Sequence, residues 1–168
     1  DIIDAMHGGY WFSCMDLLSG YYQLSLRESD RRLTAFSTPT GHFEYLVIAQ
    51  GLAGAPATFN RFVQKVFEDL RSFCRAFFDD IYIFTKSSDI GSHLEALDSV
   101  LRRCRDKRLS IKLSKCVFAS EEIPVLGEFV GRHGVRVDPD KVAIIASWPV
   151  PQTKSQVKSF LGTIQYCA

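Results

Sequence analysis

Two adjacent carboxylates stand in the middle of an apolar run, FCRAFFDDIYIFT at residues 73–85, and any fold must either expose this pair or compensate its charge. The flanking residues are mostly aromatic and β-branched, which predicts two strands with Asp79 and Asp80 at a two-residue hairpin connection. Favoured hairpin turns need positive φ, which glycine and asparagine adopt more readily than aspartate. Turn chemistry therefore explains the pair only in part. An exposed hairpin tip and a charged site in a buried sheet both stay open.

Helices are predicted in four places. The clearest begins at Pro56, because apolar residues recur at steps of three and four and form one stripe: Phe59, Phe62, Val63, Val66, Phe67 and Leu70. A second begins with a capping box at Ser92 and Glu95, and its predicted apolar face is Leu94, Leu97, Leu101 and Cys104. The other two begin at Asp138 with Pro139, and at Thr153 with Gln156.

Strands are predicted between these helices. Residues 10–18 form an aromatic-rich buried strand that ends at Ser19 and Gly20 and carries Asp16 near its end. The stretches TAFSTP, HFEYLVIA and LSIKL also have strand patterns. IPVLGEFV is expected to pair with GVRV as a hairpin across GRHG. The chain therefore mixes helices with antiparallel strands.

Composition bounds the class of protein. The chain has 168 residues, 46% apolar and 23% charged, which is ordinary for one globular domain. A net charge of +1 excludes a uniformly basic nucleic-acid coat, although basic residues gather between Arg102 and Lys115. Without a membrane-spanning run or a signal peptide, we expect an intracellular protein with no membrane partner, whether cytoplasmic, particle-associated or nuclear.

Cysteines and histidines show no metal-site spacing. The five cysteines are odd in number and lack a CxxC pair, so we expect buried, reduced thiols: Cys14, Cys74, Cys104, Cys116 and Cys167. The four histidines are expected on surface loops: His7, His42, His93 and His133. Phosphate-loop, dinucleotide and nucleophile-elbow motifs are also missing from the sequence.

Three aspartates lie in or beside buried strands, namely Asp16, Asp79 and Asp80. Unpaired buried carboxylates are unfavourable, and divalent metal ions would compensate them. Magnesium prefers such oxygen ligands, and a pair of ions would orient an attacking hydroxyl and assist a leaving pyrophosphate. The aspartates therefore suggest nucleotidyl transfer, although spacing alone does not show that Asp16 reaches the other two.

Eight blocks in fixed order resemble one family over essentially the whole chain. They are FSCMDLLSGYYQL, TAFSTPTGHFEYLVIAQGLAGAPATFNRF, FFDDIYIFT, LSIKLSKCVF, VLGEFV, VDPDKV, WPVP and FLG. This set closely resembles the reverse transcriptases of gypsy-type LTR retrotransposons. The resemblance implies an α+β right-hand polymerase palm, an antiparallel sheet backed by helices. Residues 1–137 would form the palm with partial fingers and the primer-grip hairpin, and residues 138–168 the truncated start of the thumb.

The implied activity is RNA-directed DNA polymerisation by a fragment of a retrotransposon polyprotein. Two Mg²⁺ ions, with Mn²⁺ as an alternative, would support transfer of dNTPs onto a primer 3′-hydroxyl. The implied partners are an RNA template, a DNA primer/template duplex and dNTP. The parent polyprotein would also carry protease, RNase H and integrase domains.

Site residues carry over by position. Asp16 matches the first catalytic aspartate and Asp79 and Asp80 match the YxDD pair, so Asp16 and Asp79 would be the main metal ligands, with Asp80 accessory and Leu17 beside the metal. The implied nucleotide contacts are Leu18, Ser19, Gly20, Tyr21 and Gln50, with Tyr21 blocking a sugar 2′-hydroxyl. The implied primer and template contacts are Phe77, Phe78, Leu126, Gly127, Lys112 and Lys115.

The chain departs from the family pattern at several positions. Phe77 replaces the YxDD tyrosine, Leu33 replaces a usual lysine, and Ala49 with Gln50 mixes two lineages of one loop. The basic fingers strands and most of the thumb would lie outside residues 1–168. We therefore expect the chain alone to polymerise poorly or not at all.

Two other functions stay open. A decayed or domesticated copy would keep the palm fold and nucleic-acid affinity but no catalysis. The departures from the family pattern at Phe77 and Leu33 are consistent with this alternative. A palm-type cyclase shares two-metal chemistry, but the LSKCVF, primer-grip and WPVP matches argue against it because a cyclase holds no primer.

Overall fold

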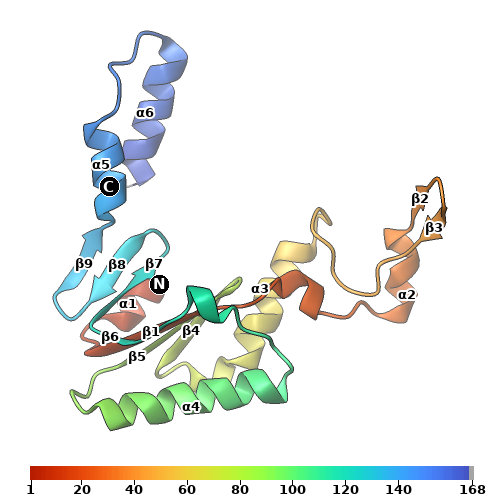
Figure 1. Cartoon of the computed structure of the whole chain (residues 1–168), viewed down its shortest axis with the longest axis horizontal. Helices are drawn as coiled ribbons and strands as arrows, with labels where there is room; N and C mark the ends of the chain where they lie inside the picture. Colours follow the sequence, from red (N-terminus) through yellow and green to blue (C-terminus); the bar gives the residue numbers. More distant parts are fainter. Residues whose placement is uncertain (167–168) are drawn as a thin grey trace.

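The computed structural model describes residues 1–166, without the side chain of Tyr166, so the predicted buried thiol of Cys167 lies outside the described residues. The centre is an antiparallel sheet in the order β4-β5-β1-β6 (Figure 1). Its strands are Cys74–Phe77 (β4), Asp80–Thr85 (β5), Trp11–Asp16 (β1) and Val117–Ser120 (β6). Strands β1 and β5 pair from Trp11 opposite Thr85 to Asp16 opposite Asp80. The predicted strand at residues 10–18 is therefore confirmed, with β1 as its core.

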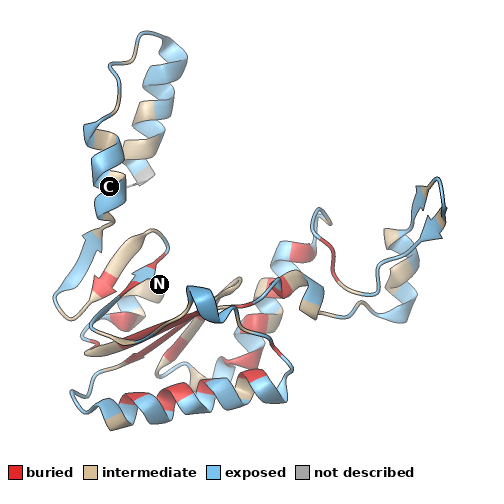
Figure 2. Cartoon of the chain, in the orientation of Figure 1, coloured by how far each residue is buried: buried red, intermediate tan, exposed pale blue. Residues whose placement is uncertain are grey.

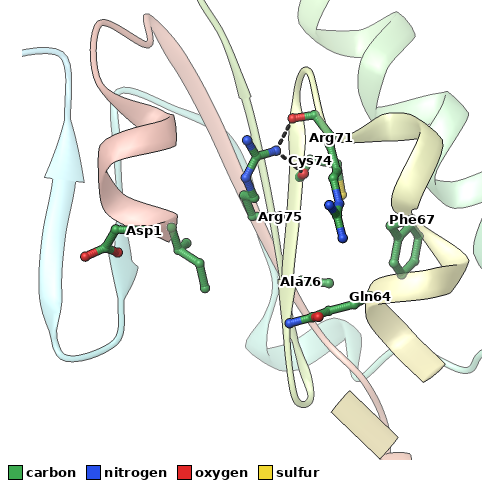
Figure 3. A pocket seen from close by; sticks show the side chains of 8 residues that line it. Asp1, Gln64, Phe67, Arg71, Cys74, Arg75 and Ala76 are labelled. Carbon is green, nitrogen blue, oxygen red and sulfur yellow. Dashed lines mark hydrogen bonds between the residues drawn. The ribbon is translucent and has the colours of Figure 1, made fainter. Parts of the chain in front are cut away.

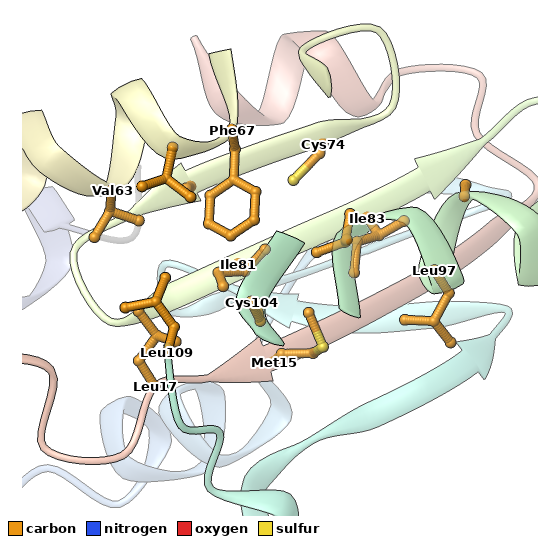
Figure 4. Close-up of a cluster of buried hydrophobic side chains, with 14 of the residues drawn as sticks. Met15, Leu17, Val63, Phe67, Cys74, Ile81, Ile83, Leu97, Cys104 and Leu109 are labelled. Carbon is orange, nitrogen blue, oxygen red and sulfur yellow. The ribbon is translucent and has the colours of Figure 1, made fainter. Parts of the chain in front are cut away.

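Two helices cover one face of this sheet, α3 (Ala55–Val66) and α4 (Ile90–Asp106), with a 3₁₀ turn, η3 (Glu68–Leu70), after α3. Their inward sides are buried together with the sheet (Figure 2). The main apolar cluster lies between these two helices and the sheet (Figure 4). Its largest fully buried members include Met15, Leu17, Phe59, Phe67, Ile81 and Ile83. The stripe predicted on α3 is therefore core, as its spacing indicated.

A smaller unit covers the opposite face. It consists of α1 (Ile2–Met6) and a second antiparallel sheet of β7 (Glu122–Val125), β8 (Glu128–Gly131) and β9 (Gly134–Val137). A second apolar cluster forms there: Met6, Phe12, Cys14, Tyr82, Phe84, Ile123, Val125 and Val130. Because successive strand residues point to opposite faces, β1 and β5 are buried on both sides.

The second sheet corrects one predicted strand. IPVLGEFV is two strands, β7 and β8, which turn at Leu126 and Gly127. Both turn residues have positive φ, 51° and 88°, which ends an extended strand. The expected hairpin across GRHG is confirmed as β8 and β9. Arg132 in that turn lies over the ring of Tyr10 at 3.7 Å from its centroid and donates to the Tyr10 carbonyl, so the hairpin is tied to the start of β1.

A small hairpin, β2 (Phe36–Thr38) with β3 (Gly41–Phe43), projects from the body next to α2 (Glu28–Arg31) and η2 (Arg32–Thr34) (Figure 1). The strand predicted for HFEYLVIA ends at Phe43. Beyond it the backbone pairs with another segment, because Leu26 donates to the Leu46 carbonyl and Ile48 to the Leu24 carbonyl, each at 2.9 Å.

Two helices extend from the second sheet, α5 (Pro139–Ala146) and α6 (Lys154–Tyr166). Both predicted N-termini are confirmed. Asp138 accepts from the Asp140 N–H at 2.9 Å, and Thr153 and Gln156 cap each other reciprocally at 3.1 and 3.3 Å.

The start of α4 differs from the prediction. Asp89 is the N-cap and accepts from the N–H groups of Gly91 and Ser92, so the predicted box at Ser92 is wrong. Of the predicted apolar face, Leu97 and Cys104 are buried. His93 is fully buried, which contradicts its predicted surface position, and Leu94 and Leu101 are exposed.

The strand predicted for LSIKL is also wrong. Ile111 forms a single bridge with Leu17, and the chain then enters a 3₁₀ turn, η4 (Leu113–Lys115). The Lys112 N–H donates to the Asp16 carbonyl at 2.8 Å, so this segment completes the end of β1 without continuing as a strand.

The described cysteines carry free thiols. Cys14, Cys74 and Cys104 are buried as predicted, and Cys116 is half-buried. Within residues 1–166, no helix combines the length and apolarity that crossing a membrane requires.

Candidate active site

The three aspartates meet at one end of the central sheet. Asp16 ends β1 and lies opposite Asp80, the first residue of β5. Because Phe77 also pairs with Asp80, the two turn residues are Phe78 and Asp79, and the predicted Asp79–Asp80 turn is wrong by one position. Phe78 adopts the positive φ of the turn, 52°. Asp80 is therefore a strand residue, which rules out a hairpin tip formed by the two aspartates.

Asp16 and Asp80 share a face of the sheet and line one cavity of about 380 Å³. The other walls include Cys14, Tyr82, Lys115 and residues 124–127, which are the end of β7 and the β7–β8 turn. The Tyr82 hydroxyl donates to Asp80 Oδ2 at 3.2 Å. The geometry thus places two of the predicted catalytic carboxylates beside the predicted primer-grip residues, although Leu126 lies 110 residues after Asp16 and 46 after Asp80 in the chain.

The carboxylates concentrate negative charge at this end of the sheet. Burial, reinforced by the charges of Asp16 and Asp80, raises the pKa of Asp79. Burial also raises the pKa of Asp80, against the hydrogen bond from Tyr82, and the Asp16 charge adds to the rise. The ammonium group of Lys115, 3.1 Å from Asp16 Oδ2, lowers both pKa values in part. The carboxylates therefore remain under-compensated despite one nearby cation.

Asp79 is held from its backbone while its side chain lacks a partner. The Leu17 N–H donates to the Asp79 carbonyl at 2.8 Å. Oδ1 of Asp79 is buried and has no hydrogen-bond partner. A Cβ on Gly20 would lie 2.2 Å from that oxygen and 2.4 Å from Phe59 Cζ. Glycine is therefore required at position 20 for the carboxylate to occupy this place.

The donor set suits a hard divalent cation. Carboxylate oxygens are the ligands that such ions prefer, and three carboxylates lie here beside the ammonium group of Lys115. Oδ1 of Asp79 is buried without a hydrogen-bond partner, and a cation would supply one. The side chains as they stand are not gathered into a finished site. Among residues 1–166, no group of three or more His, Cys, Asp or Glu side chains is arranged to hold a metal ion.

The predicted nucleotide loop follows β1 directly. Ser19 has a positive φ of 50° and leads into a 3₁₀ turn, η1 (Gly20–Gln23). Tyr21 packs on Phe59 of α3, with ring centroids 5.0 Å apart. Gln50 lies in an exposed turn before α3. No contact to a nucleotide is tested by this geometry, so these assignments stay predictions.

Gln23 was missed by the sequence reasoning. Its amide nitrogen donates to the carbonyls of Leu18 and Ser110, at 2.5 and 3.1 Å, and its amide oxygen accepts from the Ser110 N–H at 2.6 Å. These bonds join the nucleotide loop to the segment after α4. A glutamine seven residues after the end of β1 gave no recognisable pattern, because its partner Ser110 lies 87 residues away.

The predicted primer contacts lie on both sides of the carboxylates. Phe77 and Phe78 form an edge-to-face pair with centroids 4.6 Å apart, and the Phe78 N–H donates to Asn60 Oδ1 on α3. Leu126 and Gly127 form the β7–β8 turn that borders the cavity. Phe77 itself is half-buried at the end of β4 and has no hydroxyl to offer a primer.

The basic segment is largely neutralised by neighbours. Three of its arginines form ion pairs: Arg102 with Asp98, Arg103 with Asp69, and Arg105 with Asp106. Lys115 pairs with Asp16, whereas Lys112 is exposed on η4's N-terminal side. The segment as a whole therefore presents fewer free cations to phosphates than its composition suggested.

A second cavity, of about 300 Å³, lies beside the edge strand β4 and away from the carboxylates (Figure 3). Its two arginines are Arg71 and Arg75. The Arg75 guanidinium donates to the carbonyls of Arg71 and Cys74, so its charge is directed at the backbone of its own turn. Nothing in this cavity indicates a catalytic group.

Comparison with known proteins identifies the family. The family model described as "Reverse transcriptase (RNA-dependent DNA polymerase)" matches residues 1–164. The Pol polyprotein of Drosophila melanogaster transposon 297 is 36% identical over 157 residues, 93% of this chain and 15% of the relative. That of transposon gypsy from the same organism is 34% identical over 157 residues, with the same two shares.

A solved structure shows the fold. The foamy viral protease-reverse transcriptase in complex with an RNA/DNA hybrid superposes with a TM-score of 0.86 at 21% identity, covering 98% of this chain and 22% of that one. The chain thus spans less than a quarter of the length of each of these proteins. The expected polymerase palm-type fold is confirmed, and the chain belongs to the reverse transcriptase (RNA-dependent DNA polymerase) family, with gypsy-type retrotransposon proteins among its relatives.

Proposed function

We propose that this chain carries the catalytic centre of an RNA-directed DNA polymerase within a retrotransposon polyprotein. The observation that carries the proposal is the meeting of Asp16, Asp79 and Asp80 at one sheet end, where a carboxylate oxygen is buried without a partner. A site built only for stability would pair or neutralise these groups. Family membership gives the reaction class, nucleotidyl transfer of dNTPs onto a primer 3′-hydroxyl.

The metal ligands in this proposal are Asp16, Asp79 and Asp80, with Leu17 beside them. Two Mg²⁺ ions, or Mn²⁺ in their place, would supply charge stabilisation for the attacking and leaving oxygens. The chain's own contribution is to bring the three carboxylates to one end of the sheet. Tyr82 orients Asp80 by its hydrogen bond, and the Leu17 N–H fixes the backbone of Asp79.

The nucleotide is proposed to lie over the loop after β1. Backbone groups of Leu18, Ser19 and Gly20 would lie beside the triphosphate, and the positive φ of Ser19 favours N–H groups turned towards an anion. The Leu18 N–H already donates to the Ser110 carbonyl at 2.9 Å, so the donors in this proposal are those of Ser19 and Gly20. Tyr21 would close the space beside the sugar 2′ position, and its packing on Phe59 supports a fixed ring. Gln50 would lie against the nucleotide and template from the exposed turn before α3.

Primer and template are proposed to cross the cavity lined by the β7–β8 turn. Leu126 and Gly127 would hold the primer end, with Phe77 and Phe78 beside it. Lys112 would contact phosphate, and Lys115 would do so only when it leaves Asp16. The similar foamy viral structure, which contains an RNA/DNA hybrid, supports an RNA template and a DNA primer as partners.

The larger context is also a proposal. Residues 1–137 would be the palm with partial fingers and primer grip, and residues 138–168 the start of the thumb. Protease, RNase H and integrase domains would lie elsewhere in the parent polyprotein, and the activity would be intracellular. Because the chain spans a small part of its relatives' length, we expect little or no extension by the chain alone.

Primer extension tests the proposal. A longer polypeptide that includes the fingers and thumb is compared with its Asp79→Asn form on RNA and DNA templates. We expect extension by the first, and a loss of at least about a hundredfold in the second, since one charge-stabilising carboxylate is removed. Equal rates would overturn the assignment of the carboxylates. Robust extension by the isolated 168 residues would contradict the need for the other segments.

One observation favours a second candidate, a catalytically inactive nucleic-acid-binding module. Within residues 1–166, no three His, Cys, Asp or Glu side chains are arranged to hold a metal ion, and Asp16 forms an ion pair with Lys115. Nucleic-acid binding that falls steeply with salt, without extension in any longer form of the chain, would support this module.

A further inference from the structure

Lys115 places a positive charge at the centre of the candidate site. Its ammonium nitrogen lies 3.1 Å from Asp16 Oδ2, and that ion pair joins residues 99 positions apart. The cavity that contains both side chains also contains Asp80. The same ammonium lies close enough to act on the charges of Asp79 and Asp80. One side chain thus partly balances all three carboxylates.

The backbone of Lys115 is anchored to β1, while its side chain is more than half exposed. The Lys112 N–H donates to the Asp16 carbonyl at 2.8 Å, and the Lys115 N–H donates to the Lys112 carbonyl at 2.9 Å. The η4 turn is therefore anchored to the end of β1. The Lys115 side chain is 58% exposed and the Asp16 side chain 20% exposed. The ammonium approaches the carboxylate from solvent and can leave without disturbing the core.

We propose that Lys115 is a built-in counter-cation of the metal-free centre, which holds Asp16 Oδ2 until a divalent ion displaces it. The inference rests on the proposed function, because it takes Asp16 to be a metal ligand. In the metal-free state the ammonium offsets repulsion among three clustered carboxylates. Because an ammonium and a divalent cation repel each other, both cannot occupy the same carboxylate oxygen. Breaking the ion pair is then part of metal binding and weakens it.

Binding of Mn²⁺ to the full chain tests this directly. Free Mn²⁺ is measured by electron paramagnetic resonance during titration, and the binding that Asp16→Asn removes defines the site. We expect Lys115→Met to tighten that binding about three- to tenfold, the scale of a partly exposed ion pair next to a dication. Lys115→Arg keeps the charge and should stay within about twofold of the wild type.

Lys112→Met is the matched control. Lys112 is an exposed lysine three residues away, so its replacement changes the net charge equally. An equal tightening in Lys112→Met and Lys115→Met would overturn the proposal, because the effect would then be general attraction. Asp16-dependent binding by the wild type that Lys115→Met leaves unchanged would also overturn it, while the proposed function would stand. No Asp16-dependent binding in any variant would overturn both.

Thermal unfolding supplies a second readout. In EDTA, Lys115→Met should melt below the wild type, because the three carboxylates lose their counter-cation. Added Mn²⁺ should then raise the melting temperature of Lys115→Met more than that of the wild type. A variant that melts as the wild type does in EDTA would contradict the role of Lys115 in the metal-free state.

Discussion

The two ends of the β1–β5 strand pair treat polar groups in opposite ways. At one end, His93 of α4 is fully buried between Ser13 and Thr85, with its ring nitrogens 2.8 and 3.0 Å from their hydroxyl oxygens. The Ala119 N–H donates to the same Ser13 oxygen at 2.9 Å, which ties β6 to β1. At this end each nitrogen of a buried ring has a partner inside the protein.

At the other end, about 10 Å further along β1 from Ser13 to Asp16 at the usual rise per residue, carboxylates face one another across the same two strands. Asp79 Oδ1 is buried without a partner, and the pKa values of Asp79 and Asp80 are raised. The difference separates polar groups that stabilise the fold from polar groups that are available to bind a ligand. Groups that hold the sheet together are paired internally, whereas groups at the candidate site leave charge to be satisfied from outside.

The largest expected effect is at the paired end. His93→Ala removes two hydrogen-bond partners and leaves a cavity beside Ser13 and Thr85, so we expect the free energy of unfolding to fall by about 3–4 kcal/mol. Asp79→Asn, at the other end, should leave stability unchanged or raise it, because a repelled charge is removed. Urea denaturation measures both. A His93→Ala protein as stable as Asp79→Asn would remove the contrast between the ends.

Gly20→Ala should have the next largest effect. The added methyl group collides with Asp79 Oδ1 and with the fully buried ring of Phe59, so we expect a loss of about 2 kcal/mol. Gly54→Ala is the matched control, because nothing lies within 4 Å of its Cβ position. Similar unfolding curves for both variants would show that the Asp79 side chain does not occupy the place described.

Gln23→Ala should have a smaller effect, about 1 kcal/mol, through loss of the bonds to Leu18 and Ser110. In a longer, active polypeptide the KM for dNTP should rise about threefold or more while kcat changes less, since the loop would be less well positioned. Gln23→Glu keeps the accepting oxygen but loses the N–H donors of the amide, so its KM for dNTP should stay as high as that of Gln23→Ala. Rescue by glutamate would contradict the described bonds.

The pH dependence of stability should have opposite signs at the two ends. Burial lowers the pKa of His93 from its ordinary 6.5, so its contribution is present above that value and is lost as pH falls through the lower folded pKa. The raised pKa values of Asp79 and Asp80 favour the protonated forms in the folded state. Their contribution is complete below 3.8 and is lost as pH rises through the folded values.

Urea denaturation between about pH 4 and pH 7 separates these contributions. His93→Gln should flatten the loss of stability on the way down from neutral pH, and Asp79→Asn should flatten the loss on the way up from pH 4. If Asp79→Asn made stability fall more steeply as pH rises, the sign assigned to the carboxylate end would be wrong.

Local patterns predicted the fold well where the residues that determine an element lie within that element. The apolar stripe of α3 and the caps at Asp138 and Thr153 depend on residues within one or two turns, and all are confirmed. Patterns failed where a distant partner decides. LSIKL alternates as a strand, yet only Ile111 finds a bridge, with Leu17. The start of α4 was misplaced because Asp89 and Ser92 both have cap chemistry, and that shift hid the burial of His93.

For the candidate site, the resemblance predicted which residues belong together but not how they are arranged. The resemblance named Asp16, Asp79 and Asp80, and the structure brings them to one sheet end. The one-residue shift of the turn was not visible, because it is set by the pairing of Asp80 with both Phe77 and Asp16. The pairing of Lys115 with Asp16 was equally hidden, since it needs η4 folded back onto β1.

The central claim is that the carboxylate end is only partly compensated within the protein and is completed by a divalent cation. Thermal unfolding of the 168-residue chain with and without Mg²⁺ at pH 7 tests this claim most directly. We predict that Mg²⁺ at about ten times its Kd raises the melting temperature of the wild type by about 3–6 °C. Asp79→Asn should melt at or above the wild type without Mg²⁺ and should not respond to the ion. A wild type indifferent to Mg²⁺, or an Asp79→Asn protein that is less stable without it, would contradict the account.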